Sequence, residues 1–508
     1  MSKYVIGVDI GTTSTKSVLF DLAGNAIEQY TIGYLLNAPV QGAAVQDPDE
    51  IFQAVLTTVK EVVCRGEIEQ SDILCLSFSA AMHSLIVVDA RGKPLTPSLT
   101  WADNRSAGYA EKLKQEYNGY EIYARTGTPI HPMSPLVKLM WLQEDESELW
   151  QKAAKFISIK EYVFWQLFQE YVVDYSIASA TGLFNFHDLD WDEEALSIAG
   201  IKPSQLSKLV PTTQVFSSMQ SKYAQVMGID LDTPLVIGAN DGVLSNLGLG
   251  AIAPGTVAIT MGTSGAVRTT INQPGIDSQG LLFCYALTEN YWVIGGAINN
   301  GGIVLRWLKD NLADVEINTA ELLKQDPYDI LTAIANTIPP GSEGLIFHPY
   351  LAGERSPLWD ANARGSFFGL GLHHNKAHLI RAVLEGVIYN LSSVFQAVEG
   401  TRDIESISAA GGFARSSLWC QMLSDICDRE ISVPESYESS CLGAAILGQY
   451  ALGEIKDLSD FKHVAPSKVY KPIRANVAKY KQILPIYSRL LDSFKSEYQA
   501  IAKLQQDL

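Results

Sequence analysis

The sequence predicts an α/β protein built from two similar domains, and three patterns support this. Apolar, β-branched runs such as Tyr4–Ile10 alternate with segments of helical spacing such as Asp49–Val63, an order typical of sheets covered by helices. A β-turn-β unit at the start of the chain recurs halfway along it, as expected of a duplicated fold whose halves face each other across a cleft. The length of 508 residues suits two to four domains.

Turn and spacing signals predict the first elements. Tyr4–Ile10 and Ser17–Asp21 are expected to be strands joined by a turn over Gly11–Thr15. The run from Asp49 to Val63 follows an Asp-Pro start and predicts a helix, after which Ile73–Phe78 reads as another strand.

The second half repeats this order. Thr256–Met261 and Ala266–Thr270 predict strands around a second glycine-rich turn, and the lysine- and tyrosine-spaced segment after Lys468 predicts a helix. We expect an N-terminal domain at residues 1–246 and a C-terminal domain at residues 247–460, with a helical tail at 461–508 packed on the body.

Charge and composition exclude several classes of protein. Asp and Glu number 56 against 38 Lys and Arg, a formal charge of −18, so nucleic acid is not an expected partner and an anionic ligand needs a local site. The six cysteines include no CxxC pair, which argues against a zinc ribbon or a disulfide scaffold. Neither a signal peptide nor a long apolar run is present, so we expect a cytoplasmic protein with no membrane partner.

The segment around the first turn has the chemistry of a phosphate site. Gly11 lets a phosphate approach the backbone N–H groups, and Thr12 and Thr13 add hydroxyl donors. Asp9, at the end of the expected strand, is a candidate ligand for hydrated Mg²⁺. The alternative is a solvated hairpin turn, and the spacing of a Walker loop is missing.

A second group of glycines suggests a nucleotide. Gly262 and Thr263 in the second hairpin would complete a clamp on one polyphosphate, although a plain turn is the alternative. Gly411 and Gly412 follow an expected strand, where a flat ring can lie against the backbone and bond to Ser416. The alternative is a turn whose glycines serve only the packing of helix on sheet.

The remaining candidates suit a hydroxylated substrate. Asp241 follows a buried apolar run and is a candidate general base, with a helix N-cap as the alternative. Trp101, Asp103 and Arg105 combine an aromatic face with groups that bond to adjacent hydroxyls, and a helix N-cap with a surface arginine is again the alternative. His83 follows the strand at Ile73–Phe78, where a lone histidine is more often structural.

These segments together resemble the FGGY family of carbohydrate kinases, in the superfamily that also contains actin and the heat-shock ATPases. Met133–Asp145 (MSPLVKLMWLQED) is similar to the first family signature, with a slight departure at Asp145. Gly365–Glu385 (GSFFGLGLHHNKAHLIRAVLE) is similar to the second throughout. The resemblance implies two ribonuclease H-like domains flanking a cleft.

The resemblance also implies site roles. It places Asp241 at the catalytic base, Asp9, Thr12 and Thr13 on the first phosphate motif, and Gly262 and Thr263 on the second. Asn240, which precedes Asp241, is expected to bind the substrate. The resemblance places Gly302, Gly411 and Gly412 near the nucleotide, although Ala410 stands where the family has a third glycine, which leaves nucleotide preference open. ATP and Mg²⁺ are the implied cofactors, and a homodimer is one option.

Within the family, the chain looks closest to members that phosphorylate D-gluconate, with His83, Trp101, Asp103 and Arg105 holding the open-chain polyol. The gluconate carboxylate needs a cation, for which Arg105 and Lys160 rank ahead of Lys138. A xylulose kinase or another ketose or polyol kinase is the alternative, and an ATP-dependent binding or chaperone-type protein is an alternative of a different class.

Overall fold

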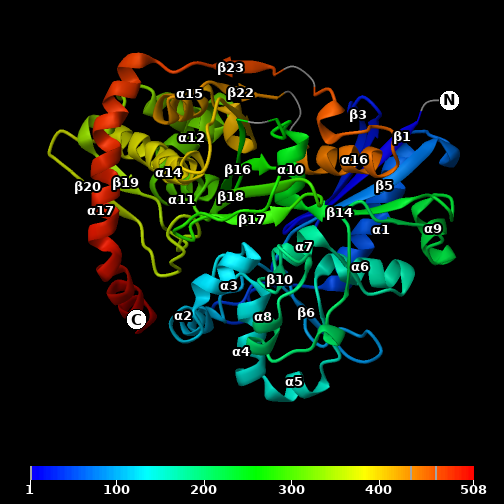
Figure 1. The fold of residues 1–508 in the computed structure, drawn as a ribbon. Coiled ribbons are helices and arrows are strands. Elements are labelled where there is room, and N and C mark those ends of the chain that lie inside the picture. The colour runs from blue at the N-terminus through cyan, green and yellow to red at the C-terminus, as the bar shows by residue number, and fades with distance from the viewer. Residues whose placement is uncertain (1–2, 254, 435–437, 464–465, 508) are drawn as a thin grey trace. The chain divides into compact units, whose positions relative to one another are not determined.

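The computed structural model describes residues 3–253, 255–434, 438–463 and 466–507 (Figure 1). It divides into two compact units. The first comprises Met1–Pro254, Thr270–Ile294 and Glu438–His463, and the second comprises Gly255–Thr269, Gly295–Tyr437 and Val464–Leu508. The units are interleaved along the chain, whereas the three domains expected from the sequence are continuous segments, so those bounds stay a prediction.

The first unit is organised by a mixed sheet of order β13-β14-β5-β1-β2-β3. Strands β14, β5 and β1 are parallel to one another, and β13, β2 and β3 pair antiparallel with their neighbours. The strands are β1 (Tyr4–Ile10), β2 (Ser14–Asp21), β3 (Ala26–Gly33), β5 (Ile73–Ala80), β13 (Val215–Phe216) and β14 (Leu235–Asn240). The strands expected at Tyr4–Ile10, Ser17–Asp21 and Ile73–Phe78 are therefore confirmed.

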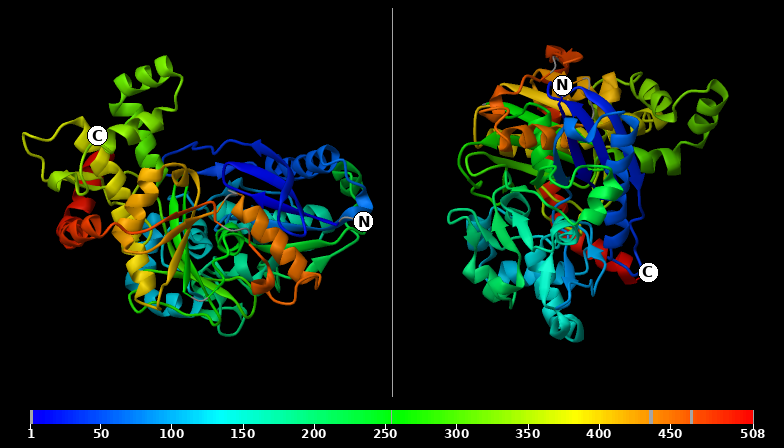
Figure 2. Two further views of the ribbon diagram at one scale, coloured as in Figure 1. Left: turned by 90° about the horizontal axis from the view of Figure 1, so that it is seen from above. Right: turned by 90° about the vertical axis from the view of Figure 1, so that its right-hand side faces the viewer.

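Helices cover this sheet. Val5, Ile6 and Val8 of β1 are fully buried on both faces of the strand. Helix α1 (Pro48–Arg65) packs on β1, β2 and β3, and α16 (Ser439–Ala451) packs on β1, β5 and β14. The views in Figure 2 show α1 in blue beside the blue strands. Helix α1 begins where the Asp-Pro signal predicts, because the Asp47 carboxylate accepts a hydrogen bond from the backbone N–H of Asp49 at 2.8 Å.

The other elements of the first unit form a mainly helical region beside the sheet, with a core that includes Leu113, Ile122 and Leu139. The helices are α2 (Ala107–Glu116), α3 (Gly119–Thr126), α4 (Pro135–Asp145), α5 (Ser147–Lys152), α6 (Ile159–Phe168), α7 (Tyr175–Ser179), α8 (Glu193–Ile198), α9 (Ser221–Met227) and α10 (Asp241–Gly248). The short strands are β4 (Val45–Gln46), β6 (Ile86–Val88), β7 (Ser98–Leu99), β8 (Lys155–Ile157), β9 (Val172–Asp174), β10 (Phe184–Asn185), β11 (Asp190–Trp191) and β12 (Lys208–Val210).

A second sheet, of order β17-β18-β16-β15-β21-β22-β23, contains most of the strands of the second unit, and β17 (Phe283–Ala286) is one of its edge strands. The strands are β15 (Thr256–Met261), β16 (Gly265–Ile271), β18 (Trp292–Ile298), β19 (Ile346–His348), β20 (Ser366–Phe368), β21 (Ser406–Ala410), β22 (Ile431–Val433) and β23 (Lys468–Tyr470). The helices are α11 (Gly302–Leu312), α12 (Asp314–Leu323), α13 (Pro327–Ala335), α14 (Lys376–Glu399), α15 (Ser417–Cys427) and α17 (Arg474–Asp507).

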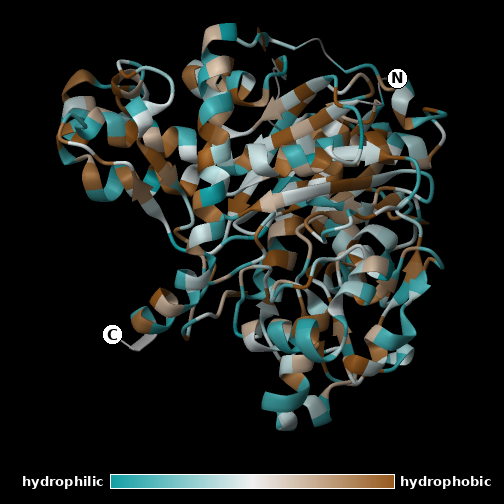
Figure 3. Ribbon diagram, turned by 60° about the vertical axis from the view of Figure 1, so that its left-hand side comes forward, coloured by the Kyte–Doolittle hydropathy of each residue, from teal (hydrophilic) through white to brown (hydrophobic). Residues whose placement is uncertain are grey.

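Many helices carry their hydrophobic residues on one face. Figure 3 colours many helices in brown and teal stripes, as expected of helices with one buried face. Within the described part of the chain, no helix combines the length and apolar character needed to span a membrane. All six cysteines are free thiols. The predicted α/β class is confirmed.

Candidate functional site

Three parallel strands of the first unit bring candidate residues to one edge of the sheet. In the strand register Asp9 of β1 lies opposite Ser79 of β5, and Asn240 of β14 lies opposite Ala80. The Ser79 hydroxyl donates to the Asp9 carboxylate at 2.6 Å. Asp241 follows as the first residue of α10. Since the carboxyl ends of parallel strands form ligand sites in α/β sheets, this edge is the candidate site of the first unit.

The electrostatics of Asp9 are those of a cation site. Burial and, next, the negative charge of Asp241 raise the pKa of Asp9 to about 7, against the hydrogen bond from Ser79 and the charge of Lys16. Lys16 lies opposite Asp9 in the hairpin register and is paired with Glu438 at 2.6 Å. Two carboxylates that disfavour each other's ionisation are stabilised by a bound cation.

Asp241 keeps its carboxylate at the start of a helix without capping it. The N-cap of α10 is Asn240, whose side-chain oxygen accepts from the backbone N–H of Val243 at 2.8 Å. The cap alternative for Asp241 is therefore wrong. The Asp241 carboxylate accepts from the N–H of Gly242 at 2.7 Å.

The first phosphate hairpin is held by aromatic side chains. The Tyr34 hydroxyl donates to the Gly11 carbonyl at 2.6 Å, and the Trp101 indole N–H donates to the Thr12 hydroxyl at 2.9 Å. Thr13 is exposed. The fold thus brings the expected polyol segment, through Trp101, against the expected phosphate hairpin, through Thr12.

Asp103 and Arg105 bind each other. The Arg105 Nε and Nη2 donate to Asp103 at 3.0 and 2.7 Å, and the guanidinium lies 4.6 Å from the Trp141 ring centroid. Asp103 is buried, whereas the Arg105 side chain keeps 24% exposure. Helix α2 begins only at Ala107, so the N-cap alternative for this segment is wrong.

Lys138 joins the loops around this segment. Its ammonium donates to the carbonyls of His83, Thr100 and Met133 at 2.8, 2.7 and 2.7 Å. Burial lowers the pKa of Lys138 to about 7. The His83 ring is itself fixed by a 2.6 Å hydrogen bond between Nδ1 and the Ala180 carbonyl.

Lys160 and Asn240 support the end of β14. The Lys160 ammonium is buried and donates to Asp174 at 2.8 Å and to the Ala239 carbonyl at 3.2 Å. Asn240 is fully buried and donates its amide to the Ser176 hydroxyl at 2.9 Å. Asn240 precedes Asp241 in the chain and Lys160 bonds to the carbonyl of Ala239, so the polar groups of both residues are bonded to the protein.

In the second unit, a cavity of about 390 Å³ collects most of the expected nucleotide residues. Gly262 and Thr263 of the hairpin, Gly302 at the start of α11, and Gly412 and Ser416 before α15 all line it. These residues come from three separate stretches of chain, so the fold confirms that they share one cavity.

Two backbone contacts show why glycine stands in these turns. The N–H of Gly302 donates to the Gly262 carbonyl at 2.7 Å, and a Cβ on Gly302 would lie 2.6 Å from that oxygen. Gly411 has φ +105°, and a Cβ there would lie 2.4 Å from the Met261 carbonyl oxygen. At Gly412, by contrast, no described atom lies within 4 Å of a Cβ. Gly411 therefore serves packing, whereas Gly412 is open to the cavity.

Sequence reasoning missed the α13 side of this cavity. Asp326, Tyr328 and Asp329 line it, together with Arg306 and Arg415. The Asp-Pro start of α13, where Asp326 accepts from the Tyr328 N–H at 2.9 Å, predicts a helix but not its position beside the glycines. In the first unit, Ser79 was missed in the same way.

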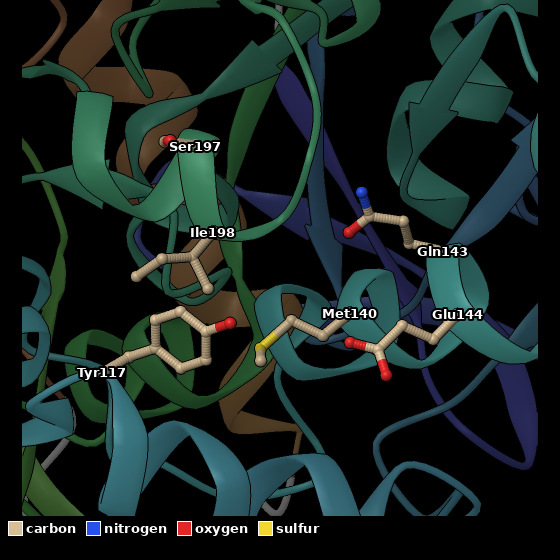
Figure 4. Close-up of a pocket in the computed structure, with 6 residues that line it drawn as sticks. All are labelled: Tyr117, Met140, Gln143, Glu144, Ser197 and Ile198. Carbon is tan, nitrogen blue, oxygen red and sulfur yellow. The ribbon is translucent and has the colours of Figure 1, made fainter.

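A second cavity, of about 520 Å³, lies in the helical region of the first unit (Figure 4). None of the expected site residues lines it. Tyr117, Met140 and Ile198 face one another there, and the Glu144 carboxylate accepts from Lys112 at 2.6 Å.

Comparison with known proteins gives the same assignment as the two signatures. The N-terminal domain model of the FGGY family of carbohydrate kinases matches residues 4–248, and the C-terminal domain model of that family matches residues 257–452. The chain belongs to the FGGY family of carbohydrate kinases. The expected resemblance is confirmed, and a chaperone-type protein is not favoured.

Individual relatives cover the whole chain. A Bacillus subtilis (strain 168) protein named gluconokinase is 55% identical, covering 100% of this chain and 99% of its own length. A solved gluconate kinase from Lactobacillus acidophilus has TM-score 0.92 at 39% identity, covering 99% of this chain and 100% of its own. A ligand-bound xylulose kinase structure from Lactobacillus acidophilus has TM-score 0.91 at 38% identity, covering 98% and 100%.

Proposed function

We propose that this FGGY kinase transfers the γ-phosphoryl group of ATP to the terminal hydroxyl of D-gluconate, giving 6-phosphogluconate and ADP. The observation that carries the choice of gluconate is the 55% full-length identity to a protein named gluconokinase. The solved gluconate kinase and the solved xylulose kinase, at 39% and 38% identity, both support the fold, and the choice of substrate rests on the relative of higher identity.

Asp241 acts as the general base. Its carboxylate accepts the proton of the attacking hydroxyl while the oxygen forms a bond to the γ-phosphorus and the bond from that phosphorus to the bridging oxygen of ADP breaks. The position supports this role, because Asp241 begins α10 at the carboxyl end of β14, and Asn240 rather than Asp241 caps that helix.

Mg²⁺ fits the donor set at the sheet edge. Asp9 is a half-buried carboxylate whose ionisation is disfavoured by Asp241, and one or two carboxylates with substrate phosphates are the usual ligands of this ion. Asp9 would hold it, with waters and phosphate completing the shell. Bound Mg²⁺ supplies neutralisation of phosphate charge.

The nucleotide is held by the second unit. The Thr263 hydroxyl is a donor for phosphate, Gly262 and Gly302 let the phosphate approach the backbone, and Gly412 and Ser416 border the space for the base. Thr12 and Thr13 of the first hairpin contact the γ-phosphate. Positioning and charge neutralisation account for most of the catalysis in such reactions.

Arg105 binds the gluconate carboxylate, and His83, Trp101 and Asp103 shape the polyol site. Arg105 is the exposed member of its ion pair, whereas Lys160 is buried against Asp174, which favours a positioning role for Lys160 and for its neighbour Asn240. Lys138 is unsuited to substrate contact because its three donors already serve three carbonyls.

Since ATP is supplied inside cells, we place the reaction in the cytoplasm.

One assay tests the proposal. ADP release is coupled to a reporter reaction with gluconate, xylulose, ribulose and glycerol as acceptors, with and without Mg²⁺. We expect kcat/KM to be highest for gluconate and to require the metal. A higher value for xylulose would assign the chain to the ketose kinases, and ADP release that no acceptor stimulates would contradict sugar phosphorylation altogether.

A further inference from the structure

We propose that Glu354 is a positioning residue for nucleotide binding, because its buried carboxylate fixes the turn from which α11 begins and thereby places Gly302 in the nucleotide cavity. The inference rests on the proposed function only in taking that cavity as the ATP site. Glu354 itself does not line the cavity.

The Glu354 carboxylate is fully buried and accepts four hydrogen bonds. One oxygen accepts from the backbone N–H groups of Asn299 and Arg355 at 2.5 and 2.8 Å. The other accepts from the side-chain amides of Asn300 and Asn390 at 3.0 and 2.7 Å. Two of these donors belong to Asn299 and Asn300, directly before the glycines that open α11, so the carboxylate constrains both backbone and side chain of that turn.

The residues on either side of Glu354 in the chain also bond to this turn. The Asn300 amide donates to the Gly353 carbonyl at 2.6 Å, and its oxygen accepts from the Ala352 N–H at 3.1 Å. Arg355 adds a bond from Nε to the Asn299 side-chain oxygen at 2.7 Å. The segment around Glu354 and the turn before α11 therefore form one hydrogen-bonded block.

This block continues into the phosphate hairpin. The N–H groups of Gly302 and Ile303 donate to the carbonyls of Gly262 and Thr263 at 2.7 and 3.1 Å. A shift of the turn would change the distance between α11 and the hairpin. These two hydrogen bonds hold the backbones in close contact, so such a shift would displace the hairpin or break the bonds. Glu354 is thus connected through its carboxylate to the turn before α11, and through the backbone of that turn to Gly302, Gly262 and Thr263, which line the cavity.

The burial of the Glu354 carboxylate supports its role in fixing the turn before α11. Burial raises the pKa of Glu354, against the hydrogen bonds that favour its ionised form. Removing a carboxylate from water is costly unless donors surround it, and a neutral side chain would fill the same volume at lower cost. Four donors on two oxygens specify one geometry for the turn, which an apolar residue would not.

The same unit offers a matched control in Glu385. It is equally buried and accepts from the Gly341 N–H at 2.9 Å, the Ser342 hydroxyl at 3.0 Å and Arg381 Nε at 2.7 Å. None of these groups lines the nucleotide cavity. Replacing Glu385 therefore perturbs a buried carboxylate network of this unit without acting on the turn.

The test compares Glu354→Gln with Glu385→Gln in the full chain. Glutamine in Glu354→Gln turns a donor toward the amides of Asn300 and Asn390, so we expect the Kd for ADP, titrated calorimetrically without sugar, and the KM for ATP to rise about tenfold or more, the equivalent of one lost charge-assisted hydrogen bond. The KM for gluconate should stay within about twofold. Glu385→Gln should lower Tm and leave both nucleotide constants unchanged.

A swap tests the geometry directly. In Glu354→Gln/Asn390→Asp the new carboxylate accepts from the new amide, and we expect most of the ADP affinity to return. If Glu354→Gln does not fold, Glu354→Asp keeps the charge, shortens its reach, and should weaken ADP binding in the same selective way.

Equal ADP affinity in folded Glu354→Gln and wild type, or equal losses in the two single variants, would overturn the inference. If the wild type binds ADP but does not phosphorylate gluconate, only the proposed substrate is wrong. If the wild type does not bind ADP, both proposals are wrong.

Discussion

The indole N–H of Trp101 donates to the hydroxyl of Thr12 at 2.9 Å. These two residues are 89 positions apart, and one belongs to the segment expected to bind the polyol while the other belongs to the hairpin expected to bind phosphate. The bond makes the polyol segment a support of the phosphate hairpin within the first unit.

Trp101→Phe keeps an aromatic face and removes this donor. We expect kcat to fall several-fold, by the roughly 0.5–1.5 kcal/mol of a typical hydrogen bond, with the fold retained. Steady-state kinetics with thermal unfolding checks this. An unchanged kcat would show that the hydrogen bond from Trp101 to the Thr12 hydroxyl does not contribute to turnover.

Asp241→Asn removes proton acceptance and keeps the shape of the side chain. We expect kcat to fall about 10²-fold or more, the usual order for loss of a general base. ADP affinity serves as the control and should be unchanged, because Asp241 lies in the first unit and the nucleotide cavity in the second. Turnover within a few-fold of wild type would remove Asp241 from the role of base.

Arg105→Ala tests the carboxylate site. We expect kcat/KM to fall about 10- to 100-fold for gluconate, by the roughly 1.5–3 kcal/mol of a hydrogen bond to a charged group, and to change much less for xylulose. Because Asp103 loses its partner in this variant, Arg105→Ala/Asp103→Asn is the matched control. Equal losses on both acceptors would show that Arg105 serves the loop and not the substrate.

Gly411→Ala and Gly412→Ala separate packing from binding. Alanine at Gly411 would place Cβ 2.4 Å from the Met261 carbonyl oxygen at a φ of +105°, so we expect a lower Tm. Alanine at Gly412 meets no described atom within 4 Å and projects into open space, so we expect an unchanged Tm and a higher KM for ATP. Thermal unfolding and ATP titration of both variants check this contrast, and a reversed result would place the base elsewhere.

Lys138 gives a pH dependence of stability. Its pKa is about 7 in the folded protein and near 10.5 when solvated, because burial disfavours the charge. Between these values the unfolded chain binds a proton that the folded chain does not, so this group stabilises the fold increasingly as pH rises from about 7 to 10.5.

Lys138→Met isolates the effect, because it removes the titrating ammonium and leaves an unbranched apolar side chain in its place. The free energy of unfolding of wild type relative to the variant should rise by at most about 1.4 kcal/mol per pH unit above pH 7 and stay level below it. Thermal unfolding of both proteins from pH 6 to 9 measures the difference. Parallel profiles would show that the folded Lys138 stays charged.

The sequence by itself determined the local features of this protein. The strand bounds at Tyr4–Ile10 and Thr256–Met261 and the Asp-Pro start of α1 follow from spacing and turn chemistry over a few residues. The glycine turns and the carboxylates Asp9 and Asp241 follow likewise, because a strand end, a turn and a reactive side chain are adjacent in the chain.

Only the tertiary structure decided which of these side chains remain available. Lys160 reads as a cation for the substrate until Asp174 is seen to accept from it, and Asn240 reads as a ligand until it is seen to cap α10. Glu354 carries no local signal, because its partners come from residues 36 to 55 positions away as well as from its neighbour Arg355. Burial and hydrogen-bond partners depend on contacts between distant segments, and these contacts set the charge and freedom of each group.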